Sequence, residues 1–155
     1  MNIQEEIVST LTQRGETVSI AESLTGGALS SELVSVAGAS HIFKGSIVAY
    51  STEIKVRELS VPLALIEKDG VVSEEVALAM AAGIQARMDT TWGISATGVA
   101  GPGSHHGIPA GTVWLAIIGP NTRETVKLAL EGDRSTVRRG AVESALGVFA
   151  RILRA

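Results

Sequence analysis

The 155-residue sequence contains no cysteine, which excludes disulfide bonds, thiol catalysis and cysteine-based zinc sites. Aromatic residues make up only 3% of the chain, so its core must be built from alanine, valine, leucine and isoleucine. No stretch approaches the run of about 18 apolar residues that a membrane-spanning helix needs. Acidic residues outnumber basic ones by 16 to 13, so the net charge of -3 gives no general attraction for nucleic acid.

Apolar residues make up 45% of the sequence and charged residues 19%, a balance typical of a compact globular protein. A length of 155 residues supports one hydrophobic core, so we expect a single domain over residues 1–155. The N-terminal segment MNIQEEIVSTLTQRG is acidic and amphipathic, unlike a signal peptide. These features predict a soluble cytoplasmic protein that binds neither membrane nor nucleic acid.

Hydrophobic periodicity predicts alternating helices and strands along the chain. A helix that ends at Gly15 precedes a short buried strand over 17–21, and a long alanine-rich helix follows Ser73. The remaining predicted helices cover 28–36, 52–59, 62–70 and 134–153, and the remaining strands cover 43–51, 91–96, 112–119 and 123–132. This order predicts an α/β fold, a three-layer α/β/α sandwich with a mixed, mostly parallel sheet whose last two strands form an antiparallel hairpin.

Ligands of α/β proteins bind beyond the carboxyl ends of strands, where loops enter helices. Three junctions of this kind combine glycine, hydroxyl and charged residues: AESLTGG (21–27), AYSTEIK (49–55) and SATGVAGPG (95–103). A purely structural loop needs only a turn and a helix cap at such a place. The three junctions are therefore the candidate sites of chemistry.

Ser23 in AESLTGG is a candidate nucleophile at the tip of a strand. In that interpretation the amides of Thr25, Gly26 and Gly27 open the next helix and face an anion or an oxyanion. The motif differs from the G-x-S-x-G elbow because Ala21 and Thr25 occupy its glycine positions. The alternative interpretation is a strand end, a helix cap and a tight turn.

A nucleophilic serine needs a base, and the sequence favours a lysine over a histidine for that role. Its histidines are His41 in a turn and the adjacent pair His105 and His106 in a glycine-rich loop, a poor arrangement for a catalytic or metal site. Lys55 falls near the positive end of a helix, where partial burial would lower its pKa from the reference of about 10.4. Tyr50 could relay a proton or orient Lys55; alternatively, Lys55 is a solvated surface residue and Ser51 merely caps the helix.

The third junction places Gly98, Gly101 and Gly103 after Thr97. Its spacing is that of neither a dinucleotide-binding fingerprint nor a P-loop. Glycine allows backbone amides to approach a phosphate or a carbonyl closely, and a flexible connection between strands explains the composition nearly as well.

The segment GDRSTVRRG (132–140) opens the last predicted helix, with Asp133 or Ser135 as its cap. Arg134 then lies at the positive end of the helix dipole, which disfavours a cation unless an anion compensates. This placement indicates a bound phosphate. Arg138 and Arg139, one turn later, are predicted to face solvent.

Together these segments resemble the CinA C-terminal domain family, which includes stand-alone nicotinamide-nucleotide amidases. The matching segments occur in family order over nearly the whole chain: AESLTGG (21–27), FKGSIVAYSTEIK (43–55), GVVSEE (70–75), ISATGVAGPG (94–103), PAGTVWLAI (109–117) and GDRSTVRRGAVESAL (132–146). The resemblance implies a three-layer α/β/α fold and deamidation of nicotinamide mononucleotide to nicotinic acid mononucleotide and ammonia. It also implies a small-molecule nucleotide as partner, no metal, no cofactor and a homodimer.

The resemblance assigns three catalytic positions: Ser23 as nucleophile, Lys55 as base and Tyr50 beside them. The implied substrate-binding positions are Thr25, Gly26, Gly27, Thr97, Gly98, Gly101 and Arg134. In the implied mechanism, amides near Gly26 or Gly98 stabilise the oxyanion, and Arg134 with a glycine-rich loop holds the 5′-phosphate.

The sequence departs from the family in SHHGIPAGTV (104–113), where Ile108 and Ala110 replace residues usual for the family. We expect this loop to border the substrate pocket, so its change bears on substrate choice. Two other functions fit the same resemblance: a pyridine-nucleotide-binding module without turnover, and an interaction protein associated with competence or DNA damage.

Overall fold

The computed structural model describes residues 1–155 and contains one five-stranded mixed sheet. Its strands lie in the order β2-β1-β3-β4-β5. The strands are β1 (Val18–Glu22), β2 (Phe43–Val48), β3 (Trp92–Gly98), β4 (Thr112–Gly119) and β5 (Thr122–Ala129). Strand β1 pairs in parallel with β2 and β3, whereas the β3–β4 and β4–β5 pairs are antiparallel.

The α/β class and the mixed sheet are confirmed, but the prediction of a mostly parallel sheet is wrong, since two of its four strand pairs are antiparallel. The reason lies in the connections. Helices join β1 to β2 and β2 to β3, and such crossovers make parallel neighbours. Residues 99–111 join β3 to β4 without a helix, and Pro120 and Asn121 join β4 to β5 in the predicted hairpin.

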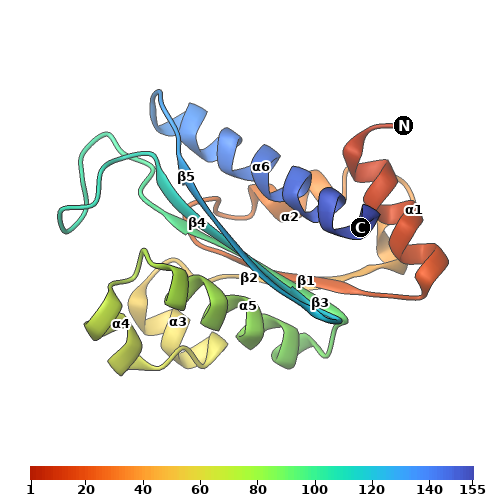
Figure 1. Ribbon diagram of the computed structural model, residues 1–155, viewed down its shortest axis with the longest axis horizontal. Coiled ribbons are helices and arrows are strands. Elements are labelled where there is room, and N and C mark those ends of the chain that lie inside the picture. The colour runs from red at the N-terminus through yellow and green to blue at the C-terminus, as the bar shows by residue number, and fades with distance from the viewer.

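Helices cover both faces of the sheet (Figure 1). Helices α1, α2 and α6 lie on one side, and α3, α4 and α5 lie on the other. The helices are α1 (Ile3–Arg14), α2 (Ala28–Leu33), α3 (Thr52–Leu59), α4 (Leu63–Asp69), α5 (Glu74–Met88) and α6 (Arg134–Arg154), with a short 3-10 helix η1 (Ala39–His41) before β2. This arrangement has the three layers that the sequence predicts.

The larger of the two main apolar clusters lies between the sheet and the α1, α2 and α6 layer. It is almost entirely aliphatic, apart from the edge-to-face pair of Trp92 and Phe149. On the opposite face, α5 packs against β4 through Ala77, Ala81 and Ala116. Small side chains allow this helix to approach the strands closely, as the aromatic-poor composition requires.

The helix ends follow the capping signals in the sequence. Gly15 has a left-handed φ of 65° at the end of α1. The side chains of Ser51 and Asp133 accept hydrogen bonds from the amides of Ile54 and Thr136, so both predicted caps are confirmed. Two helix boundaries differ from the prediction: α2 ends at Leu33 rather than near 36, and Pro62 precedes α4 instead of lying within it. Strands β2 and β5 end at Val48 and Ala129, before the predicted ends at 51 and 132.

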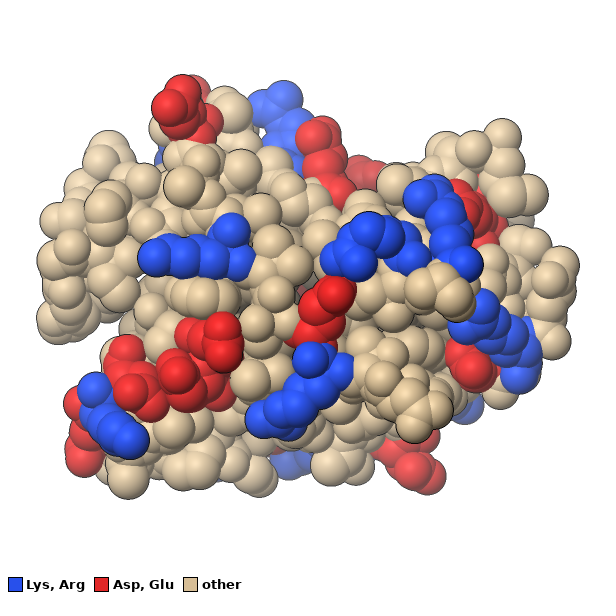
Figure 2. Space-filling view, in the orientation of Figure 1, with Lys and Arg blue, Asp and Glu red and all other residues tan.

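Charged side chains of both signs are interspersed over the face shown in Figure 2. None of the helices combines the length and the apolar character that crossing a bilayer would require.

The topology brings the candidate junctions to one edge of the sheet. Strands β1, β2 and β3 are mutually parallel through β1, so their carboxyl ends meet at the same edge. Ser23 follows β1, Tyr50 follows β2 and Gly98 ends β3. Arg134 at the start of α6 reaches the same edge, where it bonds to Tyr50 and Gly101.

Candidate active site

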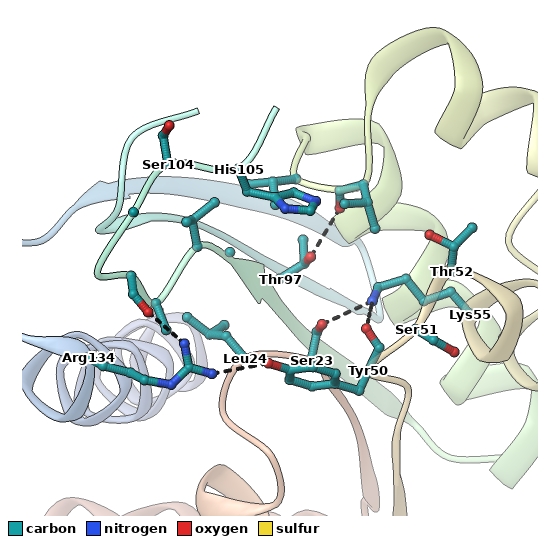
Figure 3. Close-up of a pocket in the computed structure, with 17 residues that line it drawn as sticks. Ser23, Leu24, Tyr50, Ser51, Thr52, Lys55, Thr97, Ser104, His105 and Arg134 are labelled. Atoms are coloured by element: carbon teal, nitrogen blue, oxygen red, sulfur yellow. Dashed lines mark hydrogen bonds between the residues drawn. The ribbon is translucent and has the colours of Figure 1, made fainter. Parts of the chain in front are cut away.

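A cavity of about 540 Å³ opens at this edge of the sheet (Figure 3). Seven of the ten predicted site residues line it: Ser23, Tyr50, Lys55, Thr97, Gly98, Gly101 and Arg134. The structure does not bring Thr25, Gly26 and Gly27 into its wall. A volume of this size is typical of small-molecule sites.

Ser23 and Lys55 meet at the base of the cavity (Figure 3). Lys55 Nζ lies 3.0 Å from Ser23 Oγ, although the two residues are 32 positions apart in the sequence. The Ser23 amide donates to the Ala96 carbonyl at 3.0 Å, so the end of β3 fixes the backbone of the serine. Ser23 is 7% exposed and Lys55 is 1% exposed.

The burial of Lys55 follows from its place in the first turn of α3. Ser51 caps this helix beyond the end of β2, and the lysine side chain extends from it toward Ser23. Because burial disfavours the charged ammonium, the pKa of Lys55 falls to about 8. At pH 7 about one lysine in ten is then neutral, a far larger share than for a solvated lysine.

The contacts of Lys55 suit a base that gains and loses a proton. Its Nζ donates to the carbonyls of Ala49 at 2.7 Å and of Tyr50 at 3.1 Å. A neutral amine has two N–H groups, and these two carbonyls use both of them. The remaining lone pair is then free to face Ser23 Oγ, and the third N–H of the protonated form bonds to the same oxygen.

Tyr50 contacts Lys55 through its backbone rather than through its hydroxyl group. The side chain is 62% exposed, and its hydroxyl accepts a hydrogen bond from Arg134 Nη2 at 3.1 Å. The predicted proton relay would need the hydroxyl between Ser23 and Lys55, whereas in the structure it points to Arg134 (Figure 3). The direct contact of serine and lysine makes a relay unnecessary.

Arg134 ties the start of α6 to the glycine-rich loop. Its Nη1 donates to the Gly101 carbonyl at 2.7 Å, and its side chain is exposed at the cavity. Both of its contacts are to neutral groups, and none of the ion pairs in the molecule includes it. Arg134 is therefore a cation without a counter-ion and is available to bind an anionic ligand.

Thr97 and Gly98 form the end of β3 in the cavity wall. The Thr97 hydroxyl donates to the Val71 carbonyl at 3.1 Å and joins the strand to the segment before α5. Gly98 serves close packing: a Cβ atom there would lie 2.6 Å from the carbonyl oxygen of Thr112 and 2.8 Å from Val113.

The amides of Gly26 and Gly27 are used within the protein. Gly26 donates to the Ser23 carbonyl at 3.1 Å, and Gly27 donates to Glu22 Oε1 at 3.1 Å. The amides of Leu24 and Thr25 have no acceptor in the protein. The free donors of this loop therefore come directly after Ser23 rather than from its glycines.

The sequence-based prediction did not include two charged residues near the site, Glu22 and Arg138. Glu22 is fully buried at the end of β1, and Arg138 bonds to the carbonyls of Leu24 and Thr25. The prediction that Arg138 faces solvent is therefore wrong, because its partly buried guanidinium donates to the Leu24 carbonyl and is a second donor to the Thr25 carbonyl, which also accepts from the Ala28 amide. One signal was available for Glu22: it ends a run whose other members are small or apolar.

No histidine side chain bonds to Ser23 or Lys55. His105 lines the cavity, as the loop that departs from the family was expected to do, and its ring centroid is 4.3 Å from that of His106. His41 ends η1 before β2. No three histidine, aspartate or glutamate side chains come together in a way that could hold a metal ion.

A family model described as the CinA C-terminal domain matches residues 1–153. A CinA-like protein of Frankia casuarinae is 41% identical over 152 residues, which are 98% of this chain and 35% of that protein. A CinA-like protein of Dictyoglomus thermophilum is 44% identical over 151 residues, which are 97% of this chain and 37% of that protein. The chain spans little more than a third of the length of these curated relatives.

Solved structures share the fold over almost the entire chain. The competence damage-inducible protein A of Klebsiella pneumoniae has a TM-score of 0.95 at 33% identity, covering 98% of this chain and 95% of that one. A competence-damaged protein (CinA) superfamily protein of Escherichia coli has a TM-score of 0.94 at 32% identity, covering 99% of this chain and 89% of that one.

Proposed function

The chain belongs to the CinA C-terminal domain family, and from that premise we propose that it is an amidohydrolase that deamidates nicotinamide mononucleotide to nicotinic acid mononucleotide and ammonia. The observation that carries the proposal is the buried Lys55 Nζ, 3.0 Å from Ser23 Oγ at the base of an open cavity. A lysine whose pKa is lowered to about 8 by burial is a suitable base for a serine nucleophile.

The proposed reaction proceeds in two steps through an acyl-enzyme. Neutral Lys55 takes the Ser23 proton while Oγ bonds to the carboxamide carbon and the carbonyl electrons move to oxygen. The tetrahedral intermediate collapses as the carbon–nitrogen bond breaks, and the Lys55 ammonium returns its proton to the leaving amine, which departs as ammonia. Water then attacks the ester with Lys55 again as base, and nicotinic acid mononucleotide leaves Ser23.

The oxyanion needs hydrogen-bond donors within reach of Ser23. We assign this role to the Leu24 amide, which has no acceptor in the protein and belongs to a residue that lines the cavity. In many serine hydrolases the amide that follows the nucleophile serves this purpose. The assignment replaces the glycine amides of the loop, which are already bonded to Ser23 and Glu22.

The 5′-phosphate is assigned to Arg134 at the mouth of the cavity. Its two hydrogen bonds go to neutral oxygens of Tyr50 and Gly101, and a phosphate that displaces either gains a charge-assisted contact. Arg134 also begins α6, so the helix dipole adds to its attraction for an anion.

Ammonia release from nicotinamide mononucleotide by the purified chain tests the proposal. We expect turnover by the wild type, none by Ser23→Ala, and undiminished ligand binding by that variant. Ser31→Ala is the matched control, because Ser31 is an exposed serine in α2 and should remain fully active. Full activity of Ser23→Ala would show that Ser23 is not the nucleophile.

Thermal unfolding with and without the mononucleotide, measured beside ammonia release, separates the other two functions that fit the family resemblance. Thermal stabilisation by the mononucleotide without ammonia release would indicate a binding module that lacks turnover. Neither stabilisation nor release would favour an interaction protein associated with competence or DNA damage.

A further inference from the structure

The turn that carries Ser23 is held by hydrogen bonds from two sides. Residues 23–26 form the turn, closed by the bond from the Gly26 amide to the Ser23 carbonyl. It contains both the proposed nucleophile and the free amides of Leu24 and Thr25. The conformation of this turn therefore sets where the attacking oxygen lies relative to the Leu24 amide, the proposed oxyanion donor.

On one side, Glu22 anchors the chain after the turn. Its Oε1 accepts from the amides of Gly27 at 3.1 Å and Leu29 at 3.0 Å. Its Oε2 accepts from the Ser30 amide at 2.9 Å and the Ser30 hydroxyl at 2.6 Å. The carboxylate is fully buried and forms no ion pair, so these four donors are what stabilise its charge.

On the other side, Arg138 binds the carbonyls within the turn. From the second turn of α6, its Nε donates to the Leu24 carbonyl at 2.9 Å and its Nη2 to the Thr25 carbonyl at 3.0 Å. A planar peptide points its N–H opposite to its C=O. The bond from Gly26 to the Ser23 carbonyl fixes the peptide plane that carries the Leu24 amide, and the bond from Arg138 to the Leu24 carbonyl fixes the next plane of the same turn.

The guanidinium also fits the turn sterically. A Cβ atom at Gly26 would lie 3.3 Å from Arg138 Nη2, so the glycine leaves room for the planar group beside the chain. A lysine in its place carries all its donors on one nitrogen, so it cannot present the planar fork in which Nε and Nη2 of Arg138 each bond to a separate carbonyl.

We infer that Glu22 and Arg138 are positioning residues that together hold the Ser23–Gly26 turn in the geometry needed for acyl transfer. The inference rests on the proposed function. Neither side chain lines the cavity, so each acts through the turn rather than on the substrate. The large apolar cluster packs α2 and α6 against the sheet without Glu22 or Arg138, so a role in orientation can be separated from a role in folding.

Arg138→Lys and Glu22→Gln test the inference, with Arg139→Lys and Glu32→Gln as matched controls on exposed residues of α6 and α2. We expect kcat for nicotinamide mononucleotide to fall about 10- to 100-fold in both test variants, with KM within about threefold of wild type. Added guanidinium ion should restore part of the activity that Arg138→Ala loses. A purely structural role would produce neither this split between kcat and KM nor the rescue.

The rate at which an organofluorophosphonate modifies Ser23 provides a second readout that needs no natural substrate. We expect labelling to slow in Arg138→Lys and Glu22→Gln and to stay unchanged in both controls. Wild-type kcat and labelling rate in the test variants would overturn the inference, as would losses explained by the unfolded fraction alone. If the wild type releases no ammonia but labels, the proposed substrate is wrong and labelling still decides the inference; if it does neither, both proposals are overturned.

Discussion

The two walls of the cavity differ in how they are held. The inner wall consists of the Ser23 turn and Lys55, and its polar groups are buried and bonded to β1, β3, α2, α3 and α6. The outer wall is the loop 99–111, most of whose residues between 101 and 110 are exposed or only partly buried. Arg134 holds this loop through a single side-chain contact, to the Gly101 carbonyl.

Under the proposed function, the difference assigns chemistry and recognition to separate parts of the molecule. Acyl transfer depends on distances of a few tenths of an ångström, and the inner wall fixes such distances by many internal hydrogen bonds. Substrate choice tolerates variation in an exposed surface loop, and the departure from the family pattern that the sequence predicts lies there, with His105 in the cavity wall. Changes to the inner wall should therefore alter kcat, and changes to the outer wall should alter KM.

The largest effect is expected from Lys55→Met, which removes the base and keeps most of the side-chain volume. We expect kcat/KM to fall about 10⁴-fold or more, since serine attack loses its proton acceptor. The free energy of unfolding should stay within about 2 kcal/mol of wild type, because the loss of a buried amine and the loss of donors to two carbonyls oppose each other. Ammonia release and denaturant unfolding measure the two quantities.

Lys68→Met is the control, because Lys68 is an exposed lysine of α4. It should leave both quantities unchanged. Substantial activity in Lys55→Met would mean that another group takes the Ser23 proton.

The second prediction concerns pH. Because the base must be neutral, kcat/KM should rise with pH and level off above the Lys55 pKa of about 8. Stability should follow the same group: between pH 8 and about 10.5 the unfolded chain binds more protons than the folded one, so the free energy of unfolding gains on the order of 3 kcal/mol. Below pH 8 that contribution is absent.

The difference between wild type and Lys55→Met isolates the lysine from other groups that titrate in this range. Unfolding measured at several pH values should show the gain in the wild type only. A flat difference between the two proteins would contradict a lowered pKa for Lys55.

The sequence predicts the elements well because their signals are local. The caps at Ser51 and Asp133 and the stop at Gly15 all depend on side chains within a few residues. The balance of parallel and antiparallel pairs was missed because it depends on the connection over 99–111. The sequence shows that this connection has no helix, but it does not show the direction in which the chain returns to the sheet.

The site was predictable where three strands converge and less so where hydrogen bonds cross the fold. Ser23 and Lys55 each follow a parallel strand, so topology alone brings them to one edge. The contact of Arg138 with Leu24 joins residues 114 positions apart, and no local sequence pattern predicts it. The sequence predicts that the glycine amides face an anion, but the Gly27 amide donates to Glu22, and no local pattern indicates that bond.

Arg134→Ala tests the outer wall. Without its cation at the mouth of the cavity, KM for nicotinamide mononucleotide should rise about 10-fold or more, while kcat changes about threefold at most. The effect on KM should be much smaller for an amide substrate that lacks the phosphate. Equal losses for both substrates would show that Arg134 acts on the loop rather than on the phosphate.

Tyr50→Phe distinguishes a relay from a support for Arg134. The hydroxyl bonds to Arg134 and not to Lys55, so its removal should raise KM about threefold and leave kcat close to wild type. Steady-state kinetics over a range of substrate concentrations measure both constants. If kcat instead fell about 100-fold, the relay through Tyr50 would be restored.

The smallest effect is expected from Thr25→Val, at a position to which the family resemblance assigns substrate binding. Thr25 is fully buried, its Oγ1 has no hydrogen-bond partner, and its side chain does not reach the cavity. Replacing an unpaired buried hydroxyl with a methyl group should raise the free energy of unfolding by about 1 kcal/mol. Both kinetic constants should stay within about twofold of wild type.

Thr97→Val is the matched control for this substitution, because its hydroxyl donates to the Val71 carbonyl. It should lower the free energy of unfolding by about 1 kcal/mol, opposite in sign to Thr25→Val. Denaturant unfolding of the two variants resolves the signs, and ammonia release reports on function. A tenfold loss of activity in Thr25→Val, with its stability intact, would mean that the hydroxyl turns toward the substrate during the reaction, and the inner wall would then take part in recognition as well as in chemistry.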